Sequence, residues 1–120
     1  MLIVEDSRAT RELLAAAVRT LDGVEVHMAV SGFEALKVLP RHRFALIITD
    51  LNMPDINGLE LINFVKKNPN YRQTPLFIVT TEGRDQDRQR GLKLGASEYV
   101  VKPFAADDVV ELVKKYLKLA

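Results

Sequence analysis

Two kinds of segment alternate along this chain. Short apolar runs occupy residues 2–4, 24–29, 44–49, 76–79 and 98–101, and each precedes a stretch whose apolar residues recur at helical spacing or which is mostly polar. Runs of this length indicate strands, and strands that alternate with helices are typical of a parallel sheet flanked by helices. The pattern therefore predicts an α/β fold of five strand–helix units.

The first three predicted helices have start and stop signals. Ser7 is the expected N-cap of the first helix and Asp22-Gly23 its end, while Ser31-Gly32 opens the second helix and Pro40 stops it. A loop over residues 53–57 leads to the third helix, which begins at Gly58 and ends near Asn68-Pro69. The periodic apolar positions are Leu13, Leu14, Ala17, Val18 and Leu21, then Ala35, Leu36 and Leu39, then Leu59, Ile62 and Val65.

The last two predicted helices differ in their apolar content. Residues 84–94 contain six charged side chains and few large apolar ones, which predicts a thinly buried and mobile helix. Residues 107–119 carry an apolar stripe that is typical of an amphipathic helix, and we expect Asp107 and Asp108 to cap it. The run at 44–49 is the most continuously apolar segment, which predicts a central strand covered on both faces.

Composition fits one compact domain spanning residues 1–120. The chain is 48% apolar, which suffices for a single core. With 17 basic and 16 acidic residues it lacks the charge excess of a nucleic-acid or membrane-binding surface, and no apolar run reaches the ~20 residues of a transmembrane helix. The absence of cysteine excludes disulfides and thiolate chemistry. We expect a cytoplasmic protein.

Polar side chains follow four of the predicted strands. Glu5 and Asp6 come after the first strand, Asp50 after the third, Thr80 closes the fourth and Lys102 follows the fifth. The carboxyl ends of parallel strands meet at one edge, where open α/β sheets place their ligand sites. We therefore expect these five side chains to converge.

Three neighbouring carboxylates require a compensating cation. Each close pair repels by about 4 kcal/mol at a separation of ~4 Å and an effective dielectric of ~20. A divalent metal and Lys102 are both candidates, and an all-oxygen site suits Mg²⁺ better than zinc. His27 and His42 lie far from the acids in sequence, so we expect them to be ordinary surface or partly buried residues.

This set of groups suits phosphoryl chemistry, because a phosphoryl group needs cations and hydrogen-bond donors around its oxygens. The chain has no GxxxxGK[ST] phosphate loop and no serine or cysteine beside a histidine base. The remaining hypothesis is a carboxylate that attacks phosphorus and becomes an aspartyl phosphate.

The chain resembles the receiver domain of two-component response regulators, and is most similar to single-domain receivers of the chemotaxis type. The resemblance covers essentially the whole chain and implies a doubly wound, flavodoxin-like (βα)5 fold with strand order 2-1-3-4-5. Its motifs are Val4-Glu5-Asp6-Ser7, residues 31–36, Asp50-Leu51-Asn52-Met53-Pro54 with Gly58, Val79-Thr80, Gly95-Ala96 and Val101-Lys102-Pro103-Phe104.

The resemblance implies a role for each site residue. Asp50 would accept a phosphoryl group from a histidine kinase, a phosphotransfer protein or a small phosphodonor. Mg²⁺ would be bound by Asp6, Asp50 and the main-chain carbonyl of Asn52, with Glu5 acting through water. Lys102, which precedes a cis peptide bond to Pro103, would pair with Asp50 and then with the phosphoryl oxygens.

The resemblance also implies a switch and a decay step. Thr80 would move to donate to the phosphoryl group, and Tyr99 would then rotate inward and remodel the surface of the fourth helix, fifth strand and fifth helix. A downstream protein would bind that surface, and the chain would act as a monomer or as a phosphorylation-dependent dimer. Asn52 and Glu82 would flank the hydrolytic water, and their polarity predicts a short-lived phosphoryl group. No separate substrate would be turned over.

Other functions can be weighed against this one. A haloacid-dehalogenase-type phosphatase would need a second aspartate where this chain has Asn52, and a flavin carrier would need a phosphate-friendly loop where Glu5-Asp6 lies. The alternative kept open is a phosphorylation-independent interaction module. Asp55, next to Pro54, is interpreted as a turn former.

Overall fold

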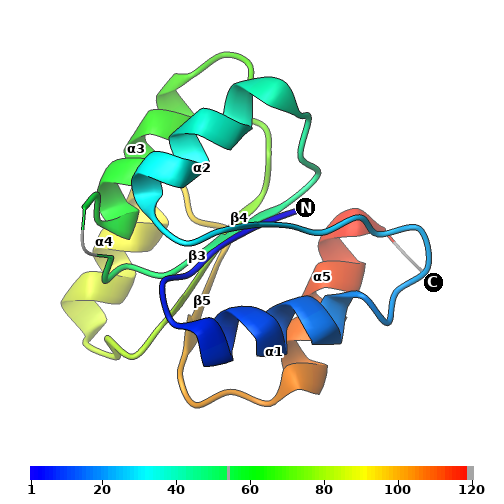
Figure 1. Cartoon of the computed structure of the whole chain (residues 1–120). Helices are drawn as coiled ribbons and strands as arrows, with labels where there is room; N and C mark the ends of the chain where they lie inside the picture. The colour runs from blue at the N-terminus through cyan, green and yellow to red at the C-terminus, as the bar shows by residue number, and fades with distance from the viewer. Residues whose placement is uncertain (54, 119–120) are drawn as a thin grey trace.

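A five-stranded parallel sheet forms the centre of the molecule. The computed structural model describes residues 1–53 and 55–118. The strands are β1 (Leu2–Val4), β2 (His27–Ala29), β3 (Ile47–Thr49), β4 (Leu76–Thr80) and β5 (Glu98–Val101), in the order β2-β1-β3-β4-β5 (Figure 1). Both the α/β class and the strand order 2-1-3-4-5 are confirmed.

Helices cover both faces of this sheet. They are α1 (Arg8–Val18), α2 (Gly32–Val38) with the short 3-10 helix η1 (Leu39–Arg41), α3 (Gly58–Lys67), α4 (Asp85–Leu94) and α5 (Ala106–Leu117). Helices α1 and α5 lie together on one face, and α2, α3 and α4 lie on the other (Figure 1). Two layers of helix on one sheet are what a doubly wound fold requires.

Alternation of side chains along the strands divides the core in two. Leu2 and Val4 of β1 face the cluster shared with α2 and α3, while Ile3 faces the cluster shared with α1 and α5. Every residue of β1, β3 and β4 is buried. The prediction that residues 44–49 supply a central, doubly covered strand is confirmed in position, because β3 lies between β1 and β4.

Two strands are shorter than predicted. Pairing covers only the last three residues of 24–29 and of 44–49. Both strands pair with β1, which is three residues long and begins its ladders at Leu2 opposite His27 and Ile47. The ladder between β3 and β4 also begins at Ile47, opposite Leu76. Apolar residues outside the ladder still pack on the core: Val24, Val26, Phe44 and Leu46.

The helix predictions also need corrections. Helix α1 ends at Val18 rather than near Gly23, and Leu13 on its outer side is 49% exposed while Ala15 is buried. Helix α5 begins at Ala106 with Ala105 as N-cap, so Asp107 and Asp108 occupy its first turn and do not cap it. They face the positive end of the helix dipole there. Leu119, the predicted end of this helix, and Pro54 lie outside the described residues.

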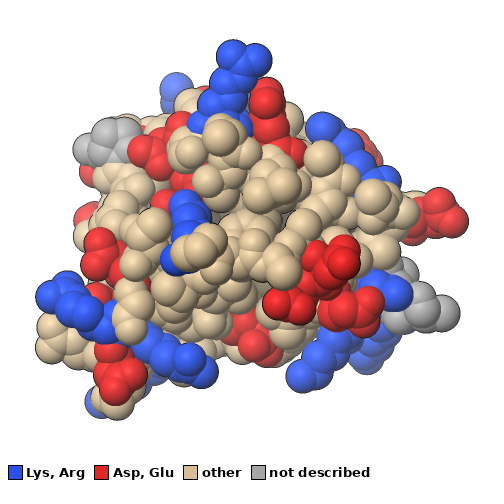
Figure 2. All heavy atoms as spheres, turned by 90° about the horizontal axis from the view of Figure 1, so that it is seen from below, with Lys and Arg blue, Asp and Glu red and all other residues tan. Residues whose placement is uncertain are grey.

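The face that carries α1 mixes charges of both signs. Seen from below Figure 1, acidic and basic side chains surround a largely uncharged central area (Figure 2). Leu13 of α1 adds exposed apolar surface. Within residues 1–53 and 55–118, no helix has the length and apolarity needed to cross a membrane.

Candidate functional site

Three carboxylates meet at the carboxyl edge of the sheet, as the sequence predicts. Glu5 and Asp6 follow β1, Asp50 follows β3, and one oxygen from each lies within 4.8 Å of the others. Glu5 and Asp50 are buried, with 1% and 8% of their surface exposed, whereas Asp6 is exposed. Neighbouring parallel strands bring these acids together although 44 positions separate Asp6 from Asp50 in the chain (50 minus 6).

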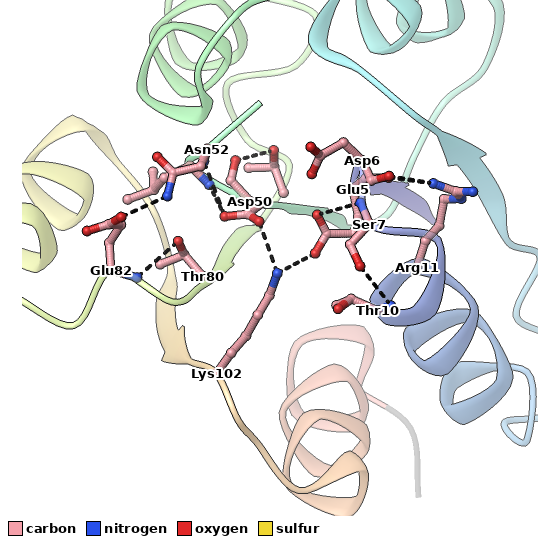
Figure 3. Close-up of polar contacts among 12 residues, drawn as sticks. Glu5, Asp6, Ser7, Thr10, Arg11, Asp50, Asn52, Thr80, Glu82 and Lys102 are labelled. Carbon is pink, nitrogen blue, oxygen red and sulfur yellow. Dashed lines mark hydrogen bonds and ion pairs between the residues drawn. The ribbon is translucent and has the colours of Figure 1, made fainter. Parts of the chain in front are cut away.

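Lys102 supplies a cation between two of the acids. Its ammonium donates to Asp50 Oδ2 over 3.0 Å and forms an ion pair with Glu5 (Figure 3). The peptide bond between Lys102 and Pro103 is cis, as the resemblance implies. The sequence predicts Lys102 as a candidate cation for the cluster of acids, and the resemblance pairs it with Asp50. The structure adds the direct ion pair with Glu5, which is 97 residues away in the chain.

The shared ammonium affects the two acids differently. Burial is the largest influence on Glu5 and raises its pKa to about 7, with the Asp50 charge adding to the rise and Lys102 opposing it. Burial also works against ionisation of Asp50, but hydrogen bonds from Lys102 and Thr80, together with the Lys102 charge, hold the pKa of Asp50 below its usual value. Asp50 is therefore ionised at neutral pH, and more fully so than Glu5.

Main-chain groups also fix the orientation of Asp50. Its Oδ1 accepts hydrogen bonds from the backbone N–H of Leu51 (2.6 Å) and of Asn52 (3.2 Å). The loop that follows closes on itself, since Gly58 N donates to Leu51 O over 2.8 Å. A Cβ at Gly58 would lie 2.2 Å from the Asp50 carbonyl oxygen, so only glycine allows this close approach.

A second group of contacts links the loops after β3 and β4. Asn52 Nδ2 donates to Glu82 Oε1 over 2.9 Å, and Glu82 N donates to Thr80 Oγ1 over 3.3 Å (Figure 3). The Tyr99 hydroxyl donates to the Glu82 carbonyl, and Tyr99 is only 8% exposed. Glu82 thus contacts the predicted switch and decay residues simultaneously, and Tyr99 already occupies an inward position.

The turn after β1 is held by residues of α1. Ser7 is the N-cap, as predicted, and its hydroxyl accepts from Thr10 N over 3.5 Å. Arg11 Nη1 donates to the carbonyls of Glu5 (2.9 Å) and Asp6 (3.3 Å), a role that sequence reasoning missed. An arginine in the second turn of a helix is too common to have indicated it.

Asp55 makes more contacts than the turn predicted from the sequence requires. Its carboxylate accepts from the backbone N–H of Gly32 and Phe33 at the start of α2, as well as from Ile56 N. The local turn is therefore present, and the Asp55 carboxylate also joins the loop after β3 to α2.

The two histidines lie away from this site, among residues before or at the start of strands. Their rings lie 4.3 Å apart between centroids, and the His27 ring lies 5.5 Å from that of Phe44. His27 opens β2, whereas the acids follow the ends of β1 and β3. Neither histidine belongs to the acidic cluster found among the described residues.

The oxygen atoms at the carboxyl edge fit a hard divalent cation. Three carboxylates from Glu5, Asp6 and Asp50 converge, and two of them are buried with a single lysine to offset their charge. Such a donor set, without nitrogen or sulfur, suits Mg²⁺ or Mn²⁺ better than zinc. The site can therefore combine a metal ion, an ionised carboxylate and the donors Lys102 and Thr80.

Comparison with known proteins agrees with this geometry. The family model for the response regulator receiver domain matches residues 1–114. The transcriptional regulatory protein SrrA of Staphylococcus aureus is 32% identical over 118 residues, which cover 98% of this chain and 47% of SrrA. The chain spans about half the length of the curated relatives it matches.

Solved structures give the same result. The chemotaxis response regulator CheY4 of Vibrio cholerae is 33% identical, with a TM-score of 0.87 over 96% of this chain and 95% of CheY4. A Mn²⁺-bound form of the response regulator Rcp1 is 27% identical, with a TM-score of 0.82 over 95% of this chain and 88% of Rcp1.

Proposed function

This chain belongs to the family of response regulator receiver domains, and from that premise we propose that it is a phosphorylation-dependent switch of a two-component system with Asp50 as phosphoacceptor. The observation that carries the assignment of Asp50 is its position. It is a buried carboxylate whose pKa lies below its usual value, and it is held by two backbone N–H groups and Lys102.

In the phosphoryl transfer, an oxygen of Asp50 forms a bond to phosphorus as the bond between phosphorus and the donor breaks. The electron pair of the broken bond leaves with the donor, which is a histidine of a kinase or phosphotransfer protein, or a small acyl phosphate. The Lys102 ammonium, 3.0 Å from Asp50 Oδ2, can move onto a phosphoryl oxygen as negative charge accumulates there.

We assign the divalent cation to Asp6 and Asp50, with the Asn52 carbonyl as a third ligand and Glu5 acting through water. Mg²⁺ bound there would neutralise charge on the transferring phosphoryl oxygens. The convergence of carboxylate oxygens supports this assignment, and the Mn²⁺-bound form of Rcp1 is a precedent in the family.

The switch uses Thr80 and Tyr99. Phosphorylation adds about −1.5 to −2 charge and new acceptor oxygens, so the Thr80 hydroxyl, which accepts from Glu82 N, would move to donate to the phosphoryl group. Tyr99 already donates to the Glu82 carbonyl. Phosphorylation would therefore increase the population of this inward Tyr99 state over an outward one.

Decay of the phosphoryl group is assigned to a water molecule between Asn52 and Glu82. The water oxygen bonds to phosphorus, the bond to Asp50 breaks, and inorganic phosphate and the free carboxylate result. The two side chains contact each other directly over 2.9 Å, so they would have to separate to admit the water. Asn52→Lys and Glu82→Leu should each change the rate of decay, and rates equal to that of the parent in both variants would refute this role.

The output surface is the α4–β5–α5 face, where a downstream protein would bind. It adjoins Tyr99, and it includes the exposed Leu92 of α4 and Val101 of β5. The chain would act through protein contact as a monomer or as a phosphorylation-dependent dimer, in the cytoplasm. Because the curated relatives that the chain matches are about twice as long, these partners are proposed for the receiver domain alone.

Intact mass after incubation with acetyl phosphate and Mg²⁺ tests the function directly. We expect one phosphoryl adduct on the parent and none on Asp50→Asn or in the presence of EDTA. An adduct that persists on Asp50→Asn would refute the assignment of the acceptor. The absence of any adduct, together with no beryllofluoride binding, would instead favour the phosphorylation-independent interaction module.

A further inference from the structure

Asp55 joins the loop after β3 to the start of α2. This β3–α3 loop comprises residues 51–57. The two Asp55 oxygens are used separately, because Oδ1 accepts from Gly32 N over 3.2 Å and Oδ2 accepts from Phe33 N over 2.9 Å. Oδ1 also accepts from Ile56 N over 2.7 Å, which fixes the carboxylate within its own loop.

The surrounding contacts are close enough to make this a defined junction. A Cβ at Gly32 would lie 2.7 Å from Ile56 Cβ and 3.1 Å from the Ile56 carbonyl oxygen. The backbone of α2 therefore packs directly against the loop. Hydrogen bonds from Phe33 N, which is the largest influence, and from other backbone groups lower the pKa of Asp55 to about 2, so its carboxylate is ionised throughout the neutral range.

The β3–α3 loop is held from two sides. Asn52 reaches toward β4 through its contact with Glu82, and Asp55 reaches α2, which follows β2. In the sheet, β4 lies on one side of β3, while β1 and β2 lie on the other. The base of the loop is closed by the hydrogen bond from Gly58 N to Leu51 O. Asn52 and Asp55 are thus held by contacts on opposite sides of β3.

We propose that Asp55 is a positioning residue for the metal site, which holds the loop so that the Asn52 carbonyl faces the carboxylates. The inference rests on the proposed function, in which that carbonyl is a metal ligand. Asp55 acts through the loop and touches neither the metal nor the phosphoryl group. Its loss should weaken cation binding first and slow phosphoryl transfer as a consequence.

The first measurement is a Mg²⁺ titration without any phosphodonor, followed through the backbone amide signals of Asp50 and Asn52. We expect Asp55→Ala to raise the dissociation constant for Mg²⁺ about tenfold, which is within the range for removal of a group that orients a metal ligand. Asp55→Asn should have an intermediate effect, because an amide oxygen can still accept from Phe33 N.

Ser31→Ala is the matched control. The Ser31 hydroxyl accepts from Glu34 N over 3.2 Å and caps the same helix, but no hydrogen bond joins it to the loop among the described residues. We expect both Ser31→Ala and Asp55→Ala to lower the melting temperature, and only Asp55→Ala to change Mg²⁺ affinity. Equal loss of affinity in both variants would mean that Asp55 acts merely through helix stability, and would overturn the proposal.

Unchanged Mg²⁺ affinity in Asp55→Ala would also overturn it. The phosphoryl assay separates this result from a failure of the proposed function. A parent protein that binds Mg²⁺ but gains no adduct would refute the phosphoacceptor role, while the titration would still decide the role of Asp55.

Discussion

Helices α1 and α4 have nearly the same length but are attached to the sheet very differently. Helix α1 buries Leu14, Ala15 and Val18 and has a side-chain cap from Ser7. Helix α4 buries only Gly91 among its described residues and has no side-chain cap bond at its N-cap. The prediction of a thinly buried fourth helix is confirmed, whereas its mobility stays a prediction.

This difference matters because both helices begin at the functional edge. Helix α1 follows Glu5 and Asp6, and α4 follows Thr80 and Glu82. Local opening requires less free energy where few apolar contacts are lost. We infer that α1 keeps the metal-binding acids in place, while α4 is the element that can respond to a change at Thr80.

The largest expected effect is a difference in stability between truncations in the two helices. Leu14→Ala should lower the free energy of unfolding by about 3 kcal/mol, because a fully buried leucine leaves a cavity. Leu92→Ala in α4 should change it by about 0.5 kcal/mol or less, since this side chain is 38% exposed. Urea denaturation of both variants measures the contrast, and equal losses would contradict it.

Hydrogen exchange should give the next largest effect. Amides in α4 should exchange about a hundredfold faster than those of Leu14 and Ala15, because α4 can open locally without unfolding the core. Beryllofluoride should change protection in α4 and leave α1 unchanged. If α4 proves as protected as α1 in the free protein, the proposed difference in mobility is wrong.

Substitution of one small residue in each helix tests the comparison between α1 and α4 further. Ala15→Gly in α1 should destabilise by more than about 1 kcal/mol, because the loss of a buried methyl group adds to the loss of helix propensity. Gly91→Ala in α4 should gain about the same free energy from helix propensity. However, the new Cβ would lie 2.6 Å from Ile78 Cδ1, so the Ile78 side chain must shift. We expect a net change smaller than about 1 kcal/mol, together with altered NMR signals of Tyr99, whose ring carbon Cδ2 would lie 3.5 Å from the new methyl group.

The smallest effect concerns the C-terminal end of α4. A Cβ at Gly95, the C-cap, would lie 2.9 Å from Lys66 Cγ, so the lysine stem supports this end. Its ammonium donates to Thr74 O (2.6 Å) and Arg72 O (3.3 Å), while burial lowers the pKa of Lys66. Lys66→Met keeps the stem and should cost less than about 1 kcal/mol. Lys66→Ala should in addition speed amide exchange at Gly95, and identical exchange in both variants would exclude support by the stem.

Sequence patterns predicted that the acids and Lys102 converge, because these residues follow apolar runs. Asp50 and Thr80 could be placed at one edge once the runs before them were interpreted as parallel strands. The short β2 and β3 could not be predicted, because strand length depends on the partner, and β1 supplies only three residues. Leu13 fits the helical period but lies beyond the width of the sheet-facing stripe.

The contacts that refine the site were outside the reach of sequence reasoning. Glu5 with Lys102 and Asp55 with Phe33 join segments 97 and 22 residues apart. Each depends on the exact approach of two loops. The inward position of Tyr99 is another such case, since it depends on where the Glu82 carbonyl points.

The sequence by itself determined the order of strands and helices, the convergence of acids at one edge and, through its motifs, the family. These properties follow from periodicity and from residue types that act over a few neighbouring positions. Only the tertiary structure decided which acid shares Lys102 with Asp50, and what holds the β3–α3 loop. Those outcomes depend on distances of a few ångströms between segments remote in the chain, which no local pattern encodes.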